Sequence, residues 1–244
     1  MKIEGLSNIG LIRRINQDSF LIAEKDDIKL MMVCDGMGGA NAGEVASLVA
    51  TQSMRKLFDS SDFNDVSKDK LKTWLKESFI KMNQSIYNEA QLNEEYSCMG
   101  TTAVAVLIHK EDIICANVGD SRVYLLDVNN KLVQITDDHS LINELVKSNR
   151  ITPDQAKSHP QRSVLTNVCG VMEHINIDLF DIKQDIKGIM CCSDGLHNML
   201  SDKRIELILK QRRSLVTKVE QLIIEANQEG GIDNITVTLA WKVK

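Results

Sequence analysis

Proline is scarce in this chain, and the compositions typical of flexible linkers are absent. Two prolines, Pro153 and Pro160, occur among 244 residues, and no Gly/Ser-rich or Pro-rich stretch separates one part of the sequence from another. With a hydrophobic content of 43%, a chain of this length is able to fill one substantial core. We therefore predict a single domain over residues 1–244.

The sequence also lacks the patterns of membrane and nucleic-acid proteins. No run of about 18 apolar residues is present, as a transmembrane helix would require, and residues 1–6 lack the apolar core of a signal peptide. A net charge of −5 does not suit a nucleic-acid partner, which needs a clustered basic face. The densest basic run, residues 210–213, is interpreted as a solvated helix end. We expect a cytoplasmic protein with no membrane or nucleic-acid partner.

Paired cysteine motifs are missing as well. None of the six cysteines forms a C-x-x-C pair, and four of them lie inside apolar, strand-like runs: Cys34, Cys115, Cys191 and Cys192. Free thiols buried in a reducing compartment explain this distribution better than disulfides, a zinc site or a redox site.

What the sequence does contain is a set of aspartates at the ends of apolar runs. Asp35, Asp120 and Asp194 each follow such a run, and Asp233 comes just before one. A single Asp-Gly pair is also a common turn dipeptide, so the inference depends on the combination. Carboxylates at several strand ends can face one shared ligand, and oxygen ligands suit hard cations. The pattern predicts a cation site.

The expected strands come in groups rather than alternating singly with helices. Strands are predicted at residues 19–24, 29–34, 102–109, 113–118, 122–127, 131–136, 175–180, 188–192 and 235–241, and helices at 42–58, 69–92, 202–209 and 215–228. Between them, residues 137–170 are polar and contain short helical pieces, one of which begins at Thr152-Pro153. Strands paired in sequence, with helices inserted in pairs, predict an α+β fold of antiparallel sheets covered by helices.

Six motifs, in this order, resemble those of the metal-dependent PPM/PP2C family of protein serine/threonine phosphatases, and in particular its bacterial stand-alone type. They are residues 10–18 (GLIRRINQD), 35–39 (DGMGG), 99–102 (MGTT), 117–122 (NVGDSR), 193–195 (SDG) and 233–236 (DNIT). The resemblance covers essentially the whole chain. It implies an αββα sandwich, two antiparallel sheets flanked by paired helices, with a flap subdomain at about residues 137–170. It also implies that the substrates are proteins phosphorylated by a Ser/Thr protein kinase, and that this protein is a monomer.

The resemblance further implies a site for two Mn²⁺ or Mg²⁺ ions. Asp35 would bridge both ions, the Gly36 carbonyl would bind one, and Asp194 and Asp233 would complete the other. Asp18 would act through bound water, and Asp120 would hold a weaker third ion together with Asp194. Arg13 matches the phosphate-binding arginine. The list of expected catalytic residues is Arg13, Asp35, Asp194 and Asp233.

The residue types make chemical sense without the family name. Asp18, Asp35, Asp194 and Asp233 carry about four negative charges, which two divalent cations would cancel. Two such ions lower the pKa of a water held between them and orient it for in-line attack on phosphorus. Arg13 supplies a planar, permanently charged fork for phosphate oxygens.

One position departs from the family pattern. Eukaryotic relatives carry a His, proposed as the general acid, where this chain has Met37. A metal-bound water is the first choice for the proton donor, and His139 and His159 are alternatives because the pKa of His suits the task. For both histidines, anchoring of the flap is the preferred interpretation. The Gly38-Gly39 pair would let the backbone pass close to the metals or simply allow the following helix to begin.

Two other functions remain open at this point. The same site could hydrolyse small phosphate esters, or the chain could be a catalytically silent relative that binds phosphopeptides. No G-x-S-x-G or C-x₅-R motif supplies an alternative nucleophile. A structural calcium module fits worst, because the acidic residues are scattered rather than gathered in one loop.

Overall fold

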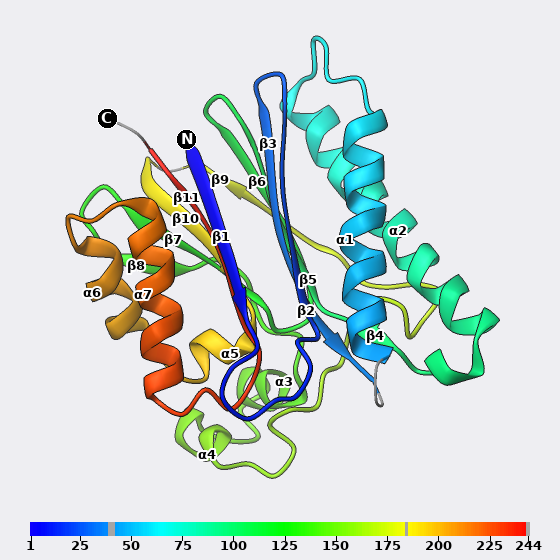
Figure 1. Cartoon of the computed structure of the whole chain (residues 1–244), viewed down its shortest axis with the longest axis vertical. Coiled ribbons are helices and arrows are strands. Elements are labelled where there is room, and N and C mark those ends of the chain that lie inside the picture. The colour runs from blue at the N-terminus through cyan, green and yellow to red at the C-terminus, as the bar shows by residue number, and fades with distance from the viewer. Residues whose placement is uncertain (39–41, 184, 243–244) are drawn as a thin grey trace.

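The protein is a sandwich of four layers in which helices cover both outer faces of two stacked sheets (Figure 1). This computed structural model describes residues 1–38, 42–183 and 185–242, and for residue 157 the backbone alone. Gly39, the second glycine of the predicted Gly38-Gly39 pair, lies outside the described residues.

The first sheet has the strand order β1-β11-β10-β7-β8, and each neighbouring pair is antiparallel. Its strands are β1 (Lys2–Asn8), β11 (Ile235–Trp241), β10 (Ile186–Cys192), β7 (Arg122–Asp127) and β8 (Leu132–Gln134). β1 lies at one edge, so the amino-terminal strand pairs with the last strand of the chain.

The second sheet has the order β2-β3-β5-β6-β9 and is also antiparallel. Its strands are β2 (Asp18–Lys25), β3 (Ile28–Met37), β5 (Ala103–His109), β6 (Asp112–Val118) and β9 (Asp178–Ile182), and the short β4 (Gly100–Thr101) pairs with the end of β3. β2 and β3 form a hairpin with a two-residue turn, because Lys25 pairs with Ile28.

Two pairs of helices cover the outer faces. α1 (Ala42–Ser60) and α2 (Lys68–Leu92) lie on the second sheet, and α6 (Asp202–Lys210) and α7 (Leu215–Gln228) lie on the first (Figure 1). Serine side chains accept backbone hydrogen bonds at the first turns of α2, α6 and α7, which is the usual way to satisfy free N–H groups there. The shorter helices are α3 (Leu141–Lys147), α4 (Pro153–Lys157), α5 (Asp194–His197) and the 3₁₀ turn η1 (Glu94–Tyr96).

Three hydrophobic clusters hold these layers together. One lies between the two sheets, where Met31, Val106, Leu125 and Ile189 are completely buried. The other two fill the space between each sheet and its helices. Each fully buried aliphatic side chain contributes about 1.5–3 kcal/mol, so the sheets form a firm support for the loops at their ends.

The α+β sandwich predicted from the sequence is confirmed, and β7, β11 and α7 have the predicted bounds. Other details were wrong or missing. β1 and α5 were not predicted, β9 spans Asp178–Ile182 rather than residues 175–180, and β8 is shorter than the strand predicted at 131–136. Thr152 caps α4 with Pro153 at its first position, as predicted. In the described part of the chain, no helix is long and apolar enough to span a membrane.

Candidate active site

A cavity of about 240 Å³ lies where the loops at one end of both sheets meet. Six of the seven residues predicted for the site line it: Arg13, Asp35, Gly36, Asp120, Asp194 and Asp233. The seventh, Asp18, is 8% exposed and pairs with Asp35 across the β2–β3 ladder. The fold thus brings together residues that are up to 220 positions apart in the sequence.

Asp18 lies beneath the cavity and is held from the first sheet. The Ser193 hydroxyl donates to its Oδ2 at 2.7 Å, and the same hydroxyl accepts the backbone N–H of Thr236 at 3.0 Å. The other oxygen, Oδ1, is buried and has no hydrogen-bond partner among the described residues. A buried acceptor without a donor is costly, so this oxygen has capacity for a ligand.

Two threonines fix the backbone of Asp35. Thr102 accepts the Asp35 N–H through its hydroxyl at 2.9 Å, and the Thr101 hydroxyl donates to the Asp35 carbonyl at 2.9 Å. The Thr102 hydroxyl also shares a 2.7 Å hydrogen bond with Ser121, the residue after Asp120. The loop that carries Asp120 is therefore connected to the strand that carries Asp35.

Asp194 occupies the first position of α5, where the positive end of the helix favours a carboxylate. Asn198 donates to its Oδ2 at 3.0 Å, whereas Oδ1 is buried without a partner in the described part of the chain. His197, from the same helix, lies 3.1 Å from the Asp120 carbonyl oxygen through Nε2. Burial, and then the charge of Arg122, lower the pKa of His197 to about 3, so it is neutral and donates this bond.

Arg13 and Asp233 form an ion pair at the mouth of the cavity, with Nη2 donating to Oδ2 at 2.7 Å. Asn234 fixes the loop that carries Arg13: its side-chain amide donates to the carbonyls of Ile9 and Ile15, and its oxygen accepts the N–H of Gln17. Its own backbone N–H donates to Asp233 Oδ1 at 2.9 Å.

The carboxylates raise one another's proton affinity. Burial, and next the charges of the neighbouring aspartates, raise the pKa of Asp35 well above its usual range. Burial is also the largest cause for Asp18 and Asp120, whose pKa values are each raised to about 7. The pKa of Asp194 is raised by burial and by Asp233. Such a cluster needs a positive counter-charge to be fully ionised at neutral pH.

The residues fit a cation site of a particular kind. All the atoms that could bind an ion are oxygens, two carboxylate oxygens are buried without partners among the described residues, and burial and then mutual repulsion raise the pKa of Asp35. Over the described ranges, however, no three His, Cys, Asp or Glu side chains are close enough to enclose an ion. The carboxylates surround a cavity instead. This arrangement suits Mg²⁺-like ions, which keep several waters and use few protein ligands each.

Neither histidine proposed as a proton donor lines the cavity. His139 Nδ1 accepts the N–H of Gly119 at 3.1 Å, and its Nε2 lies 3.2 Å from Asp178, so it connects the start of the 137–170 segment to the Asp120 loop. His159 is half-buried and accepts the N–H of Gln161. Met37 does line the cavity.

Sequence reasoning missed several residues at the site. Gln17, Ser163 and Leu165 line the cavity, and His197 supports Asp120. Ser163 and Leu165 belong to the 137–170 segment. An isolated antiparallel β-bridge between Ser140 and Leu165 joins the two ends of this segment. No motif distinguishes these two residues, because their position depends on how the segment folds back.

Comparisons with known proteins agree with this geometry. The family model for Protein phosphatase 2C matches residues 13–231. The chain is 38% identical to a serine/threonine phosphatase stp of Listeria welshimeri over 98% of this chain and 95% of that protein. It is 34% identical to the protein phosphatase PhpP of Streptococcus pneumoniae, over 98% of this chain and 96% of that protein.

Solved structures give the same result. The crystal structure of the serine/threonine phosphatase Stp1 from Staphylococcus aureus superposes with a TM-score of 0.93 at 33% identity, covering 100% of this chain and 95% of that one. The serine/threonine phosphatase PstP/Ppp of Mycobacterium tuberculosis gives a TM-score of 0.87 at 32% identity over 100% and 99% of the two chains.

The fold, the relatives and the cavity at the sheet ends define a serine/threonine protein phosphatase. The chain belongs to the protein phosphatase 2C family, and its substrates are phosphoproteins.

Proposed function

We propose that this phosphatase hydrolyses phosphoserine and phosphothreonine with the help of two Mn²⁺ or Mg²⁺ ions held by Asp18, Asp35, Asp194, Asp233 and the Gly36 carbonyl. The observation that carries the proposal is the group of mutually repelling carboxylates around one cavity, with buried oxygens of Asp18 and Asp194 left without partners in the described chain. When bound, the two ions would supply the Lewis acidity that activates a water for in-line attack on phosphorus. Metal dependence is typical of the family.

The protein groups have separate tasks in this proposal. Asp35 and Gly36, at the end of β3, are positioned to bind ions because Thr101 and Thr102 hold the backbone there. Arg13 binds the non-bridging phosphate oxygens. To do so, its guanidinium either keeps its ion pair with Asp233 while also donating to phosphate, or breaks that pair. Asp120 would hold a weaker third ion with Asp194. Reaction occurs in one step, without a covalent intermediate on the protein.

The test measures phosphate release from a phosphothreonine peptide and from a small aryl phosphate, with Mn²⁺ and then with excess chelator. We expect turnover of both substrates with Mn²⁺, and loss of turnover with chelator that added Mn²⁺ restores. Full turnover under chelation would contradict the metal proposal. Turnover of the aryl phosphate alone would favour a small-ester hydrolase, and no turnover of either would favour a silent phosphopeptide-binding protein.

We also propose that the substrates are products of a Ser/Thr protein kinase and that the protein acts as a cytoplasmic monomer. The residues 137–170 would act as a flap, because Ser163 and Leu165 of this segment line the cavity where a substrate would enter. Size-exclusion chromatography with light scattering tests the monomer directly.

A further inference from the structure

A second, larger groove lies at the opposite end of the first sheet from the candidate active site. It measures about 810 Å³ and is formed where β1 begins, where β11 ends and where α6 passes into α7. Trp241, the last residue of β11, contributes to its wall and pairs in register with Lys2 and Gly188. Asp233 comes just before the other end of β11, so about 20 Å of strand separates the groove from the cavity.

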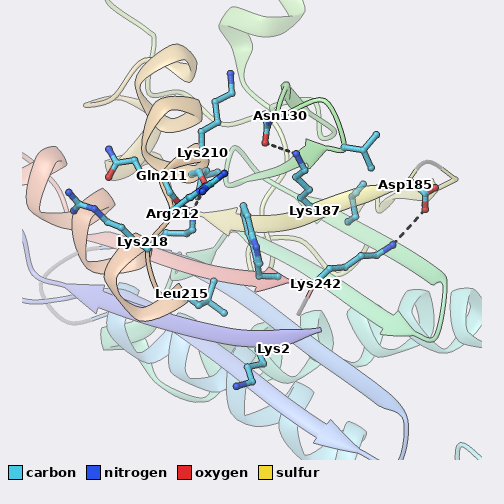
Figure 2. Close-up of a pocket in the computed structure, with 15 residues that line it drawn as sticks. Lys2, Asn130, Asp185, Lys187, Lys210, Gln211, Arg212, Leu215, Lys218 and Lys242 are labelled. Carbon is cyan, nitrogen blue, oxygen red and sulfur yellow. Dashed lines mark hydrogen bonds and ion pairs between the residues drawn. The ribbon is translucent and has the colours of Figure 1, made fainter. Parts of the chain in front are cut away.

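This groove is strongly basic in a protein whose net charge is −5. Seven basic residues and one acidic residue, Asp185, line it. Figure 2 shows the cations coming from several elements, with Lys210 and Arg212 near the end of α6, Lys187 and Lys242 on the neighbouring strands, and Lys2 on β1 with its side chain pointing away from the others. The cations are spread along the groove and do not converge on one point, so they suit several negative charges in a row.

Most of these cations have no carboxylate to neutralise them. Among the described residues, the side chains of Lys2 and Arg212 form no hydrogen bond or ion pair, and Lys187 donates to the neutral side chain of Asn130 at 2.7 Å. Lys210 pairs with Glu206 at 2.5 Å. Lys242 lies 3.6 Å from Asp185, at the long end for an ion pair. The chain has 34 acidic and 29 basic residues, so acidic partners are not scarce. The concentrated positive potential would attract an anionic partner.

One lysine is built into the wall of the groove. Lys218 is 4% exposed, and its ammonium donates to the carbonyls of Leu209 and Gln211, which end α6. It also lies 4.6 Å from the centre of the Trp241 ring. These contacts hold the α6–α7 connection, and with it Arg212, in place against the sheet.

The groove has other features that a simple anion would not use. Ile186, Leu209 and Leu215 are among its lining residues, and the side-chain oxygen of Gln211 is buried with no donor in the described part of the chain. The surface therefore offers cations and apolar contacts together. An extended peptide supplies the matching carboxylates and apolar side chains. A membrane surface does not match a recessed groove, and a long nucleic acid would be repelled by the acidic remainder of the molecule.

We propose that this basic groove docks an acidic peptide segment of the phosphoprotein substrate, away from the site of hydrolysis. This inference rests on the proposed function. A linker of about ten extended residues spans roughly 33 Å, which is enough to connect the groove with the cavity around the surface. The groove would thus select substrates that carry an acidic segment about that far from the phosphorylated residue.

Direct binding is the first test. The probe is a fluorescent peptide in which glutamates alternate with leucine and alanine, together with a version in which every glutamate is glutamine. The groove variant is Lys2→Glu/Arg212→Glu, and the matched control, Lys70→Glu/Lys81→Glu, changes the net charge equally on exposed positions of α2, on the other face of the sandwich. We expect the groove variant and the glutamine peptide each to weaken binding by about tenfold or more, and the control variant to bind like the parent protein.

Turnover is the second test. The acidic peptide is joined through the linker to a phosphothreonine, and kcat/KM is compared with that for a small aryl phosphate. The groove variant is expected to lose about tenfold in kcat/KM on the joined substrate and to keep its aryl phosphate activity. If the parent protein does not hydrolyse the aryl phosphate, the proposed function is contradicted. The docking proposal is still tested in that case, because peptide binding is measured without turnover.

Three results would overturn the docking proposal. The first is equal peptide binding by the groove variant and the parent protein. The second is binding of ATP or a single-stranded oligonucleotide in the groove with no binding of the acidic peptide. The third is an equal loss of binding in the control variant, which would show that net charge alone is responsible.

Discussion

The guanidinium of Arg13 donates to the carboxylate of Asp233 at 2.7 Å. One is the proposed phosphate-binding group and the other a proposed metal ligand, so in this structure each partly neutralises the other. The hydrogen bond to Asp233 is also the largest effect on the pKa of Arg13, which it raises. Binding of metal to Asp233 would weaken this pair and leave the guanidinium available for phosphate.

Replacement of Arg13 tests that relationship. Hydrogen bonds to charged groups contribute about 1.5–3 kcal/mol, so we expect Arg13→Ala to raise KM for a phosphopeptide about tenfold or more. We also expect half-maximal activity at a lower Mn²⁺ concentration, because Asp233 loses its competing cation. Steady-state kinetics over a Mn²⁺ series measure both. Arg14→Ala is the matched control, and unchanged KM in Arg13→Ala would remove Arg13 from the site.

Asp194 is the second position to change. Its Oδ1 is buried without a partner in the described chain, and Asn198 holds its Oδ2. We expect Asp194→Asn to reduce kcat by about a thousandfold or more, since a neutral amide would bind a divalent cation poorly. Asp27→Asn, in the exposed hairpin turn, is expected to keep full activity. Turnover of Asp194→Asn at the parent rate would show that the metal assignment is wrong.

Glu225 provides a prediction about stability and pH. Burial, the largest single effect, raises its pKa, but hydrogen bonds from Arg204 and Gln221 together with the charges of Arg204 and Arg213 outweigh burial and lower it. A carboxyl whose folded pKa lies below its unfolded value stabilises the protein above the unfolded pKa, and this contribution disappears as pH falls through the folded pKa. We expect Glu225→Gln to lower Tm at pH 7.

The difference in Tm between Glu225→Gln and the parent should shrink as pH falls below the unfolded pKa of a glutamate, about 4.3. Thermal unfolding followed by circular dichroism at several pH values measures it. Glu220→Gln on the same helix, whose side chain is exposed, serves as the control. A difference that stays constant down to pH 3 would show that Glu225 acts through packing rather than charge.

The burial of the cysteines predicts how many thiols react in the native protein. Cys98 is exposed, and the other five are buried and free. Burial raises the pKa of each buried thiol, among them Cys34 and Cys115, which removes the reactive thiolate form. A thiol reagent should therefore label one cysteine rapidly in the native protein and all six after unfolding. Cys98→Ser should abolish the rapid reaction, and rapid labelling of a second thiol would contradict the burial.

The sequence was a good guide to the elements that carry strong local patterns. β7 contains a continuous apolar run, β11 alternates apolar residues with Thr236 and Thr238, and α7 ends before Gly230, so all three were predicted with correct bounds. β1 was missed because its seven residues alternate weakly and include Gly5, whose missing side chain leaves room for Phe20. Its place as a strand depends on pairing with β11, a partner more than 200 residues away.

The candidate site was predictable as a set of residues but not as an arrangement. The motifs placed Asp35, Asp120 and Asp194 at strand ends, and the fold brings them to one cavity. The ion pair of Arg13 with Asp233 and the support of Asp120 by His197 depend on distances between loops, which no local pattern encodes. The basic run at residues 210–213 was interpreted as a solvated helix end, because Lys2 and Lys187 join it only in three dimensions.

The pairing of Asp18 with Asp35 makes the far end of the β2–β3 hairpin matter for catalysis. The two-residue turn at Asp26 and Asp27 sets the register of the whole ladder, although it lies about 25 Å from the cavity. Exchange of Asp26, whose φ is 53°, for Asn or Gly should be harmless. A single inserted residue, if the ladder shifted to absorb it, would turn Asp18 to the opposite face of the sheet. For anyone engineering this hairpin, its length is therefore a stricter constraint than its composition.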